Sequence, residues 1–523
     1  MLADNMNDPV PVVKDIDEIY PQDALKFQEK RFEQLRKLFS ETYGGRSPQF
    51  IARSPGRVNL IGEHIDYSLY EVLPMAIAAD VLIAVRVISQ NSQENKIKIH
   101  VSNVNSEKFK DGEFSVPQHG NIEIDASTLQ WTNYFKAGFR GAVGLLQREH
   151  AGFSPSGMEV LVDGTVPAGG GLSSSAAFVC ASALATLRAN GLEKVPKKEL
   201  VELAIVSERS VGVNSGGMDQ TASVFSVRGD AVSIKFSPEL HAEALPFPKT
   251  EPPITFMIAQ SFIAADKHVA APEQYNFRVV ECTLAAEVLA AKLELKLEAD
   301  SGPLGSSLRG FQTAYFDSPK GGYKSDPEKQ IEVMLSLSQD ILDKSEGYDR
   351  EEIASFLNMS TPALEERFMK KFPVRGERFY LRQRAHHVFT EALRVQAFKT
   401  LLQHPPPDAN TTLLPRLGAI LNKSHASSRD VYVHSCPEID RMCDIALEAG
   451  SYGGRVTGAG WGGCSVHLVP KEKIEAVKAA WEEKYYRKLE PKITEEKLAE
   501  AVVVSEPGHG AMLYVHRQTL SHK

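Results

Sequence analysis

The sequence is short of several features that would each mark a particular class of protein. Its 523 residues include only five cysteines, an odd number with no C-x-x-C pair, which argues against a disulfide scaffold and a zinc site. The net charge of −8 argues against nonspecific nucleic-acid binding, which needs a basic surface. No apolar run approaches the roughly 18 residues of a membrane span, and residues 1–14 hold no apolar core of a secretory signal. We therefore expect a cytoplasmic protein with neither nucleic-acid nor membrane partners.

The common lysine-bearing phosphate loop is also missing, because no lysine follows a G-x-x-x-x-G spacing. The chain has instead the loop Val166-Pro-Ala-Gly-Gly-Gly-Leu-Ser-Ser-Ser-Ala-Ala-Phe178, which does not carry the G-x-G-x-x-G dinucleotide fingerprint. It lies between a predicted strand at 158–162 and a predicted helix at 176–187. Such a loop directs backbone N–H groups and a helix N-terminus at one point, which suits a phosphate. A glycine-rich turn before a serine-capped helix is an equally good interpretation of this loop alone.

A second polar segment runs from Arg53 to Tyr67 with the sequence RSPGRVNLIGEHIDY. It places Arg57, Glu63, His64 and Asp66 within ten positions, around the apolar residues 58–61. A surface turn with solvated charges would have this composition too. We favour the rim of a ligand site, since binding residues concentrate on loops that a rigid scaffold holds in place.

Two further glycine-rich turns follow. In residues 212–220, Asp219 stands two positions after the pair Gly216-Gly217, where it either caps the next helix or is presented to a substrate hydroxyl. Between Gly450 and Gly463 there are seven glycines, followed by a predicted strand at 465–469, and such a turn can approach a ligand closely. Elsewhere, periodicity predicts helices at 25–39, 131–146, 198–208, 275–291, 331–342, 381–402 and 474–485, with strands at 80–88 and 252–260.

These segments, in this order, resemble the GHMP small-molecule kinases. Gly56 to Tyr67 is similar to the galactokinase signature almost letter for letter, and Pro167 to Ala177 matches the P-x-x-x-G-L-S-S-S-A phosphate loop. Arg455 to Cys464 matches the C-terminal glycine motif of the same superfamily. The resemblance covers about residues 45–516, and the chain is most similar to a fungal galactokinase.

The resemblance implies a two-lobed α+β fold, with a ribosomal-S5-like N-terminal lobe, a ferredoxin-like C-terminal lobe and an active site between them. We expect an N-terminal arm and helix at 1–44, the first lobe at 45–245 and the second at 246–523. Residues 295–380 are expected to be an insertion. The implied reaction transfers the γ-phosphoryl group of ATP to the 1-hydroxyl of galactose, with Mg²⁺.

The resemblance also implies a role for individual residues. Asp219 matches the catalytic carboxylate, and Arg57 matches the arginine beside it, which would keep the carboxylate ionised. Ser175 and Glu208 match the magnesium ligands, and Trp131 is a weak candidate for an adenine contact. The galactose-binding residues would be Arg57, Glu63, His64, Asp66, Gly216, Gly217, Asp219 and Tyr275. The nucleotide-binding residues would be Gly169, Gly170, Gly171, Leu172, Ser173, Ser174, Ser175 and Ala176.

Three alternatives stay open at this point. Some fungal paralogues of galactokinase are galactose- and ATP-dependent sensors that bind a transcriptional repressor, and these lack a Ser-Ala pair in the phosphate loop. The complete Ser173–Ala177 run favours catalysis, although one protein can combine both roles. An N-acetylgalactosamine kinase would share the fold, while Glu63, His64 and Asp66 argue against a mevalonate or homoserine kinase. Oligomeric state and any regulatory partner are not decidable from the sequence.

Overall fold

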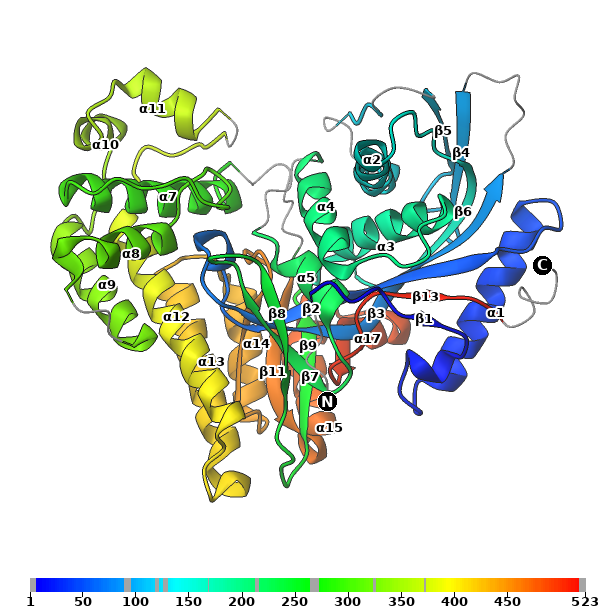
Figure 1. The fold of residues 1–523 in the computed structure, drawn as a ribbon. Coiled ribbons are helices and arrows are strands. Elements are labelled where there is room, and N and C mark those ends of the chain that lie inside the picture. The colour runs from blue at the N-terminus through cyan, green and yellow to red at the C-terminus, as the bar shows by residue number, and fades with distance from the viewer. Residues whose placement is uncertain are drawn as a thin grey trace.

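The computed structural model describes residues 6–88, 96–117, 122–125, 130–167, 169–211, 216–263, 272–322, 326–370 and 373–516. Its first sheet has seven strands, and the long strands β2 and β3 lie at its centre (Figure 1). In spatial order the strands are β1 (Val12–Val13), β13 (Met512–Tyr514), β2 (Phe50–Ile61), β3 (Leu73–Ile88), β6 (Gly157–Gly164), β4 (Lys96–Asn103) and β5 (Gly112–Pro117).

Helices cover both faces of this sheet. They are α1 (Leu25–Thr42), α2 (Thr132–Glu149), α3 (Ser174–Ala189), α4 (Lys197–Arg209) and α5 (Met218–Phe225). Because α3 is apolar on all sides and buried along most of its length, it packs in the interior between the sheet and α2 (Figure 1). The amphipathic α1 packs Phe32, Leu35 and Phe39 against the opposite face. The first lobe is therefore a sheet between two helical layers.

The second lobe is built on a four-stranded antiparallel sheet. Its strands in spatial order are β10 (Gly453–Thr457), β11 (Cys464–Pro470), β9 (Ile254–Gln260) and β12 (Val502–Ser505), and β7 (Asp230–Lys235) with β8 (His241–Pro246) forms a separate hairpin. Helices α14 (Pro437–Glu448) and α15 (Ile474–Trp481) cover one face, where Trp481 is fully buried. The short helices α16 (Arg487–Leu489) and α17 (Glu495–Ala501) lead into β12.

A helical body completes this lobe, at the left of Figure 1. It consists of α7 (Tyr275–Lys292), α8 (Leu308–Asp317), α9 (Pro327–Ile341), α10 (Arg350–Phe356), α11 (Thr361–Phe368), α12 (Leu381–Gln403) and α13 (Ala409–Asp430). Four of these, α8 to α11, come from residues 295–380. They pack on α7 and α12 through buried apolar residues such as Phe311 and Leu364.

The structure confirms the α+β, two-lobed architecture and the helices expected from periodicity, with small changes at their ends. The strand expected at 80–88 already begins at Leu73. β2 continues past Pro55 to Ile61, with one register shift beside this residue without an N–H, between Pro55 and Arg57, and a second between Asn59 and Ile61. Arg57 therefore lies within a strand rather than on a loop.

The division at 45–245 and 246–523, and the insertion at 295–380, stay predictions. The strand β13, from the end of the chain, pairs with β2 in the first sheet. Among the helices that the structure describes, none has the length and apolar character to cross a membrane.

Candidate active site

The Asp219 carboxylate, in the turn at 216–220, contacts both the glycine-rich loop at 166–178 and the polar segment at 53–67. Asp219 lies in the first turn of α5, just after Gly217, whose φ of 109° only glycine adopts readily. Arg57 Nε donates to Asp219 Oδ1 at 2.7 Å, and Ser173 Oγ donates to Oδ2 at 2.6 Å. Arg57 also donates through Nη1 to the Gly171 carbonyl at 2.7 Å. Asp219 is thus held between Arg57 of β2 and Ser173 of the predicted phosphate loop.

The Arg57 guanidinium stays protonated although it is buried. Burial would lower the pKa of this guanidinium, but the carboxylates of Asp219 and then Glu63 raise it above its ordinary value. Arg57 Nη2 lies 2.6 Å from Asp219 Oδ1, so the two side chains form an ion pair. The pair can therefore orient a hydroxyl or accept its proton, and it offers positive charge to an incoming phosphoryl group.

The glycine-rich loop before α3 lies directly against β2 and the third glycine segment. Gly169 and Gly171 have φ of 76° and 72°, and Ser173, the residue before α3, has φ of 58°. A Cβ atom on Gly56 would lie 2.8 Å from the Leu172 carbonyl, and one on Gly458 would lie 2.4 Å from the Gly171 carbonyl. Glycine at both positions lets the backbones come into contact. The polar segment at 53–67 and the glycine segment at 450–463 therefore both lie against this loop.

The remaining nucleotide-binding candidates lie along the same loop. Leu172 and Ala176 are buried, while Ser174 and Ser175 are partly exposed in the first turn of α3. Gly170 packs close to the sulfur of Cys464. Ala168 lies outside the described residues. The exposed hydroxyls and the helix N-terminus leave this end of α3 suited to an anion.

Asp66 is brought to the second glycine turn. It begins the short 3₁₀ helix η2 (Asp66–Ser68), and its Oδ2 accepts from the Gly216 N–H at 3.1 Å. A Cβ on Gly216 would lie only 2.4 Å from that oxygen, which explains the glycine. Burial, and then the nearby Asp219 charge, raise the pKa of Asp66 to about 6. Residues 212–215 of the same turn lie outside the described residues.

Both ring nitrogens of His64 have protein partners. Nε2 is 3.0 Å from the Ala459 carbonyl, which only accepts, so Nε2 carries the proton and Nδ1 accepts from the Tyr67 hydroxyl at 2.9 Å. Burial lowers the pKa of His64 to about 3, so the ring is neutral at physiological pH. Tyr275, the first residue of α7, packs its ring 5.3 Å from His64. A sugar hydroxyl at Nε2 would compete with the Ala459 carbonyl.

Glu63 lies on the inner side of the same loop, where 2% of its surface is exposed. Its Oε2 is 3.2 Å from Nη1 of Arg455, a fully buried residue of β10. Burial raises the pKa of Glu63 to about 7, although Arg455 and Arg57 both act to lower it. No role for Arg455 was expected from the sequence. The signal that could have found it is a lone charged side chain among glycine, valine and threonine, because a buried charge needs an opposite charge nearby.

Of the residues expected to hold magnesium, Ser175 lies in the first turn of α3 and Glu208 lies near the end of α4. Glu208, near the end of α4, is buried and accepts from the side-chain amide of Gln220. Over the described ranges there is no group of three His, Cys, Asp or Glu side chains placed to hold a metal ion. The Trp131 ring stacks on Phe178 at 5.9 Å and its N–H donates to the Lys110 carbonyl.

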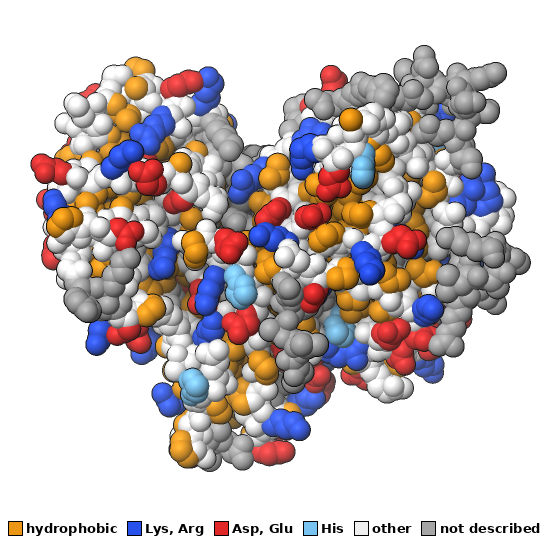
Figure 2. Space-filling view, viewed as in Figure 1, with side chains coloured by type: hydrophobic (Ala, Val, Ile, Leu, Met, Phe, Trp, Pro, Cys, Tyr) orange, Lys and Arg blue, Asp and Glu red, His pale blue; other side chains and the backbone are white. Residues whose placement is uncertain are grey.

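The molecular surface is hollowed between the two lobes. Figure 2 shows this hollow at the top of the view, with acidic and basic side chains gathered below it. α4 borders it on one side and the body around α7 on the other (Figure 1).

Comparisons with known proteins match most of the length of the chain. The galactokinase galactose-binding signature matches residues 37–87, and the N-terminal and C-terminal domains of GHMP kinases match residues 133–227 and 409–487. The galactokinase of Saccharomyces cerevisiae is 40% identical over 503 residues, which cover 91% of this chain and 93% of that protein. The galactokinase of Schizosaccharomyces pombe is 38% identical over 506 residues, covering 93% and 96%.

The fold is shared with a solved structure as well. The crystal structure of Lactococcus lactis galactokinase complexed with galactose matches with a TM-score of 0.65 at 24% identity, covering 92% of this chain and 99% of that one. The expected GHMP kinase fold is thereby confirmed. With matches along nearly its whole length, the chain belongs to the galactokinase family within the GHMP kinases and is an ATP-dependent sugar kinase.

Proposed function

We propose that the protein transfers the γ-phosphoryl group of ATP to the 1-hydroxyl of galactose, giving galactose 1-phosphate and ADP. The observation that carries this proposal is the contact of Asp219 with both Arg57 and Ser173. This contact supports the proposal because Arg57 belongs to the segment proposed to bind the sugar, and Ser173 belongs to the loop proposed to bind phosphate. Such a site has the parts that phosphoryl transfer needs, namely positioning and electrostatic stabilisation.

In the proposed reaction the sugar O1–H bond breaks and a bond forms from O1 to the γ-phosphorus. The bond from that phosphorus to the β,γ-bridging oxygen breaks, and its electron pair stays on ADP. Asp219 orients the hydroxyl and takes up its proton. Arg57 stabilises the negative charge of the phosphoryl oxygens as they separate from ADP.

The galactose side of the proposed site is formed by Glu63, His64, Asp66, the turn at Gly216-Gly217 and Tyr275. The two carboxylates are buried, at 2% and 5% exposure, so a hydroxyl that reaches them is recognised in a water-poor environment. A buried polar group left without a partner costs about 1–3 kcal/mol, which favours a ligand rich in hydroxyls over an apolar one. Among the described residues Glu63 Oε2 makes no well-aligned hydrogen bond, although it is paired with Arg455 at 3.2 Å, so it can still accept from such a ligand.

On the nucleotide side, the loop from Gly169 to Ala176 would bind phosphates through backbone N–H groups. The donors proposed for magnesium are the Ser175 hydroxyl and the Glu208 carboxylate. Both supply oxygen, the ligand atom that this hard cation takes, so the donor set fits the ion. When bound, magnesium neutralises part of the phosphate charge.

The test is ADP release with magnesium-ATP across galactose, glucose, N-acetylgalactosamine and mevalonate, with and without EDTA. We expect turnover with galactose alone and its loss in EDTA. Equal turnover with N-acetylgalactosamine would reassign the sugar. No turnover, while galactose and ATP still bind together in calorimetry, would contradict the proposal and favour a sensor.

A further inference from the structure

A buried arginine of the second lobe, Arg455, contacts the segment around Glu63 that is proposed to bind the sugar. Arg455 projects from β10 with none of its side chain exposed. Its Nη1 lies 3.2 Å from Glu63 Oε2, and 3.4 Å and 3.3 Å from the carbonyls of Asn59 and Leu60. The guanidinium therefore contacts both the end of β2 and the carboxylate that follows it.

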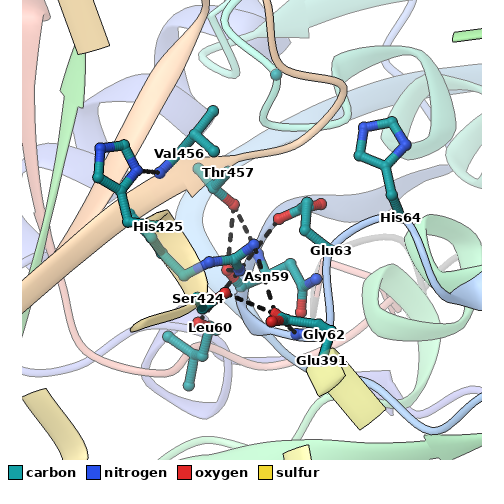
Figure 3. Close-up of polar contacts among 12 residues, drawn as sticks. Asn59, Leu60, Gly62, Glu63, His64, Glu391, Ser424, His425, Val456 and Thr457 are labelled. Atoms are coloured by element: carbon teal, nitrogen blue, oxygen red, sulfur yellow. Dashed lines mark hydrogen bonds and ion pairs between the residues drawn. The ribbon is translucent and has the colours of Figure 1, made fainter. Parts of the chain in front are cut away.

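A second carboxylate lies on the other side of this guanidinium. Glu391 of α12 is also fully buried, and its Oε1 is 3.9 Å from Arg455 Nη2. Oε1 accepts from the Gly62 N–H at 3.1 Å and from Ser424 Oγ at 2.6 Å, while Oε2 accepts from Arg394 at 2.8 Å. Figure 3 shows Glu63 and Glu391 directed toward the same interior position from the loop and from α12. Glu391 thus fixes the backbone immediately before Glu63.

The strand that carries Arg455 is itself fastened to β2. The Asn59 N–H donates to Thr457 Oγ1 at 3.2 Å, and the Thr457 hydroxyl donates to the Asn59 carbonyl at 3.1 Å. The Glu63 carbonyl is 3.1 Å from His387 Nε2 of α12. These contacts hold the backbone around Glu63 between β10 and α12 of the second lobe. Because that backbone is fixed, Arg455 acts on Glu63 through the orientation of its carboxylate.

We propose that Arg455 is a positioning residue for sugar recognition, which orients the Glu63 carboxylate toward a galactose hydroxyl by lying between Glu63 and Glu391. This inference rests on the proposed function, because it takes Glu63 as a sugar ligand. Arg455 itself does not touch the sugar. Its planar fork spans two carboxylates and two carbonyls at once, a geometry that the single ammonium of lysine does not reproduce.

The test is a double-mutant cycle on Arg455→Lys and Glu63→Gln, with galactose Kd from calorimetry and KM and kcat from ADP release. We expect Arg455→Lys to raise galactose Kd and KM about 10-fold or more, by weakening one charge-assisted hydrogen bond to the sugar. We expect kcat at saturating galactose and the KM for ATP to stay within about 2-fold. In the Glu63→Gln background the same substitution should change Kd less than about 2-fold, because residues that act through each other are not additive.

Arg31→Lys is the matched control. Arg31 is a buried arginine that also spans two carboxylates, Asp80 at 2.6 Å and Asp163 at 2.7 Å, and it lies on α1 against the outer face of the first sheet. Its replacement should lower the unfolding temperature and leave galactose Kd unchanged. A rise in Kd of similar size in both arginine variants would indicate general loss of structure and would overturn the proposal.

Two other results would also overturn it: wild-type Kd in a folded Arg455→Lys protein, or the same fold-change with and without Glu63. If Arg455→Lys does not fold, Glu63→Gln is compared with Glu63→Gln/Arg455→Met, which loses the arginine together with one carboxylate. Equal Kd in that pair supports the role, and a further large loss refutes it. Failure of the wild-type protein to bind galactose would refute the proposed function, and this role with it, before any substitution is made.

Discussion

Replacing Asp219 by asparagine separates the chemical role of this side chain from its role in holding the site. The carboxylate accepts from Arg57 at 2.7 Å and 2.6 Å through Oδ1, and from Ser173 at 2.6 Å through Oδ2. Asparagine has nearly the same shape and its Oδ1 can still accept from Arg57, but its amide nitrogen cannot accept from the Ser173 hydroxyl, which must turn and accept instead. It also removes the negative charge that holds a proton.

The expected loss is large in turnover and small in sugar affinity. A positioned proton acceptor contributes about 10²- to 10⁴-fold to a rate, or about 3–5 kcal/mol of barrier, so kcat should fall by that factor. Galactose Kd should rise by no more than about 10-fold, the effect of one hydrogen bond. The stability cost should stay near 2 kcal/mol, below the 3–5 kcal/mol of a fully buried pair, because the Asp219 side chain is 16% exposed.

The assay compares initial rates of ADP release at saturating galactose with calorimetric galactose Kd and thermal unfolding. Asp163→Asn is the matched control, since Asp163 pairs with a buried arginine at 2.7 Å and its side chain is 15% exposed. That variant should show a similar loss of stability and normal turnover. Near wild-type kcat in folded, galactose-binding Asp219→Asn protein would remove Asp219 from catalysis.

Four further predictions concern Ser173, Glu63 and Gly458. Ser173→Ala removes a hydroxyl that donates to Asp219, so kcat should fall about 3- to 10-fold, and a fall of equal size in an Asp219→Asn background would contradict this route. Because burial raises the pKa of Glu63 to about 7, kcat/KM for galactose should fall as pH is lowered from 8 to 6, a dependence that Glu63→Gln should remove. The folded-state pKa is above the ordinary 4.5, so the contribution of Glu63 to folding stability falls as pH rises from about 4.5 to about 7, as urea unfolding would show. Gly458→Ala would place a Cβ 2.4 Å from the Gly171 carbonyl, so the KM for ATP should rise at least about 10-fold while galactose Kd stays normal; unchanged KM would mean that the loop adapts.

Local patterns in the chain predicted most of the secondary structure and the chemistry of the site. The apolar run of α3 and the glycines before it are read from neighbouring residues, since helix propensity and left-handed turns depend on the local chain. The same holds for the order of the three glycine-bearing segments, which carried the family resemblance. Asp219, Arg57 and Ser173 were each singled out in this way.

The contacts among those three residues could not be predicted from local patterns. Arg57 and Asp219 are separated by 162 positions, and Ser173 and Asp219 by 46, so no local pattern states that they touch. The extension of β2 to Ile61 was also not predicted, because Pro55 interrupts a strand pattern and only the two register shifts allow the ladder to continue.

Sequence alone thus determined the elements and the residue types of the site, because these depend on periodicity and turn chemistry, and the family resemblance of the motifs implied the two-lobed kinase architecture. Only the tertiary structure decided the environment of each side chain. Arg455 contacts Glu63 across 392 positions, and both ring nitrogens of His64 are engaged by Tyr67 and Ala459. Burial and long-range partners set the ionisation of such groups, and neither is written in the residues on either side of them.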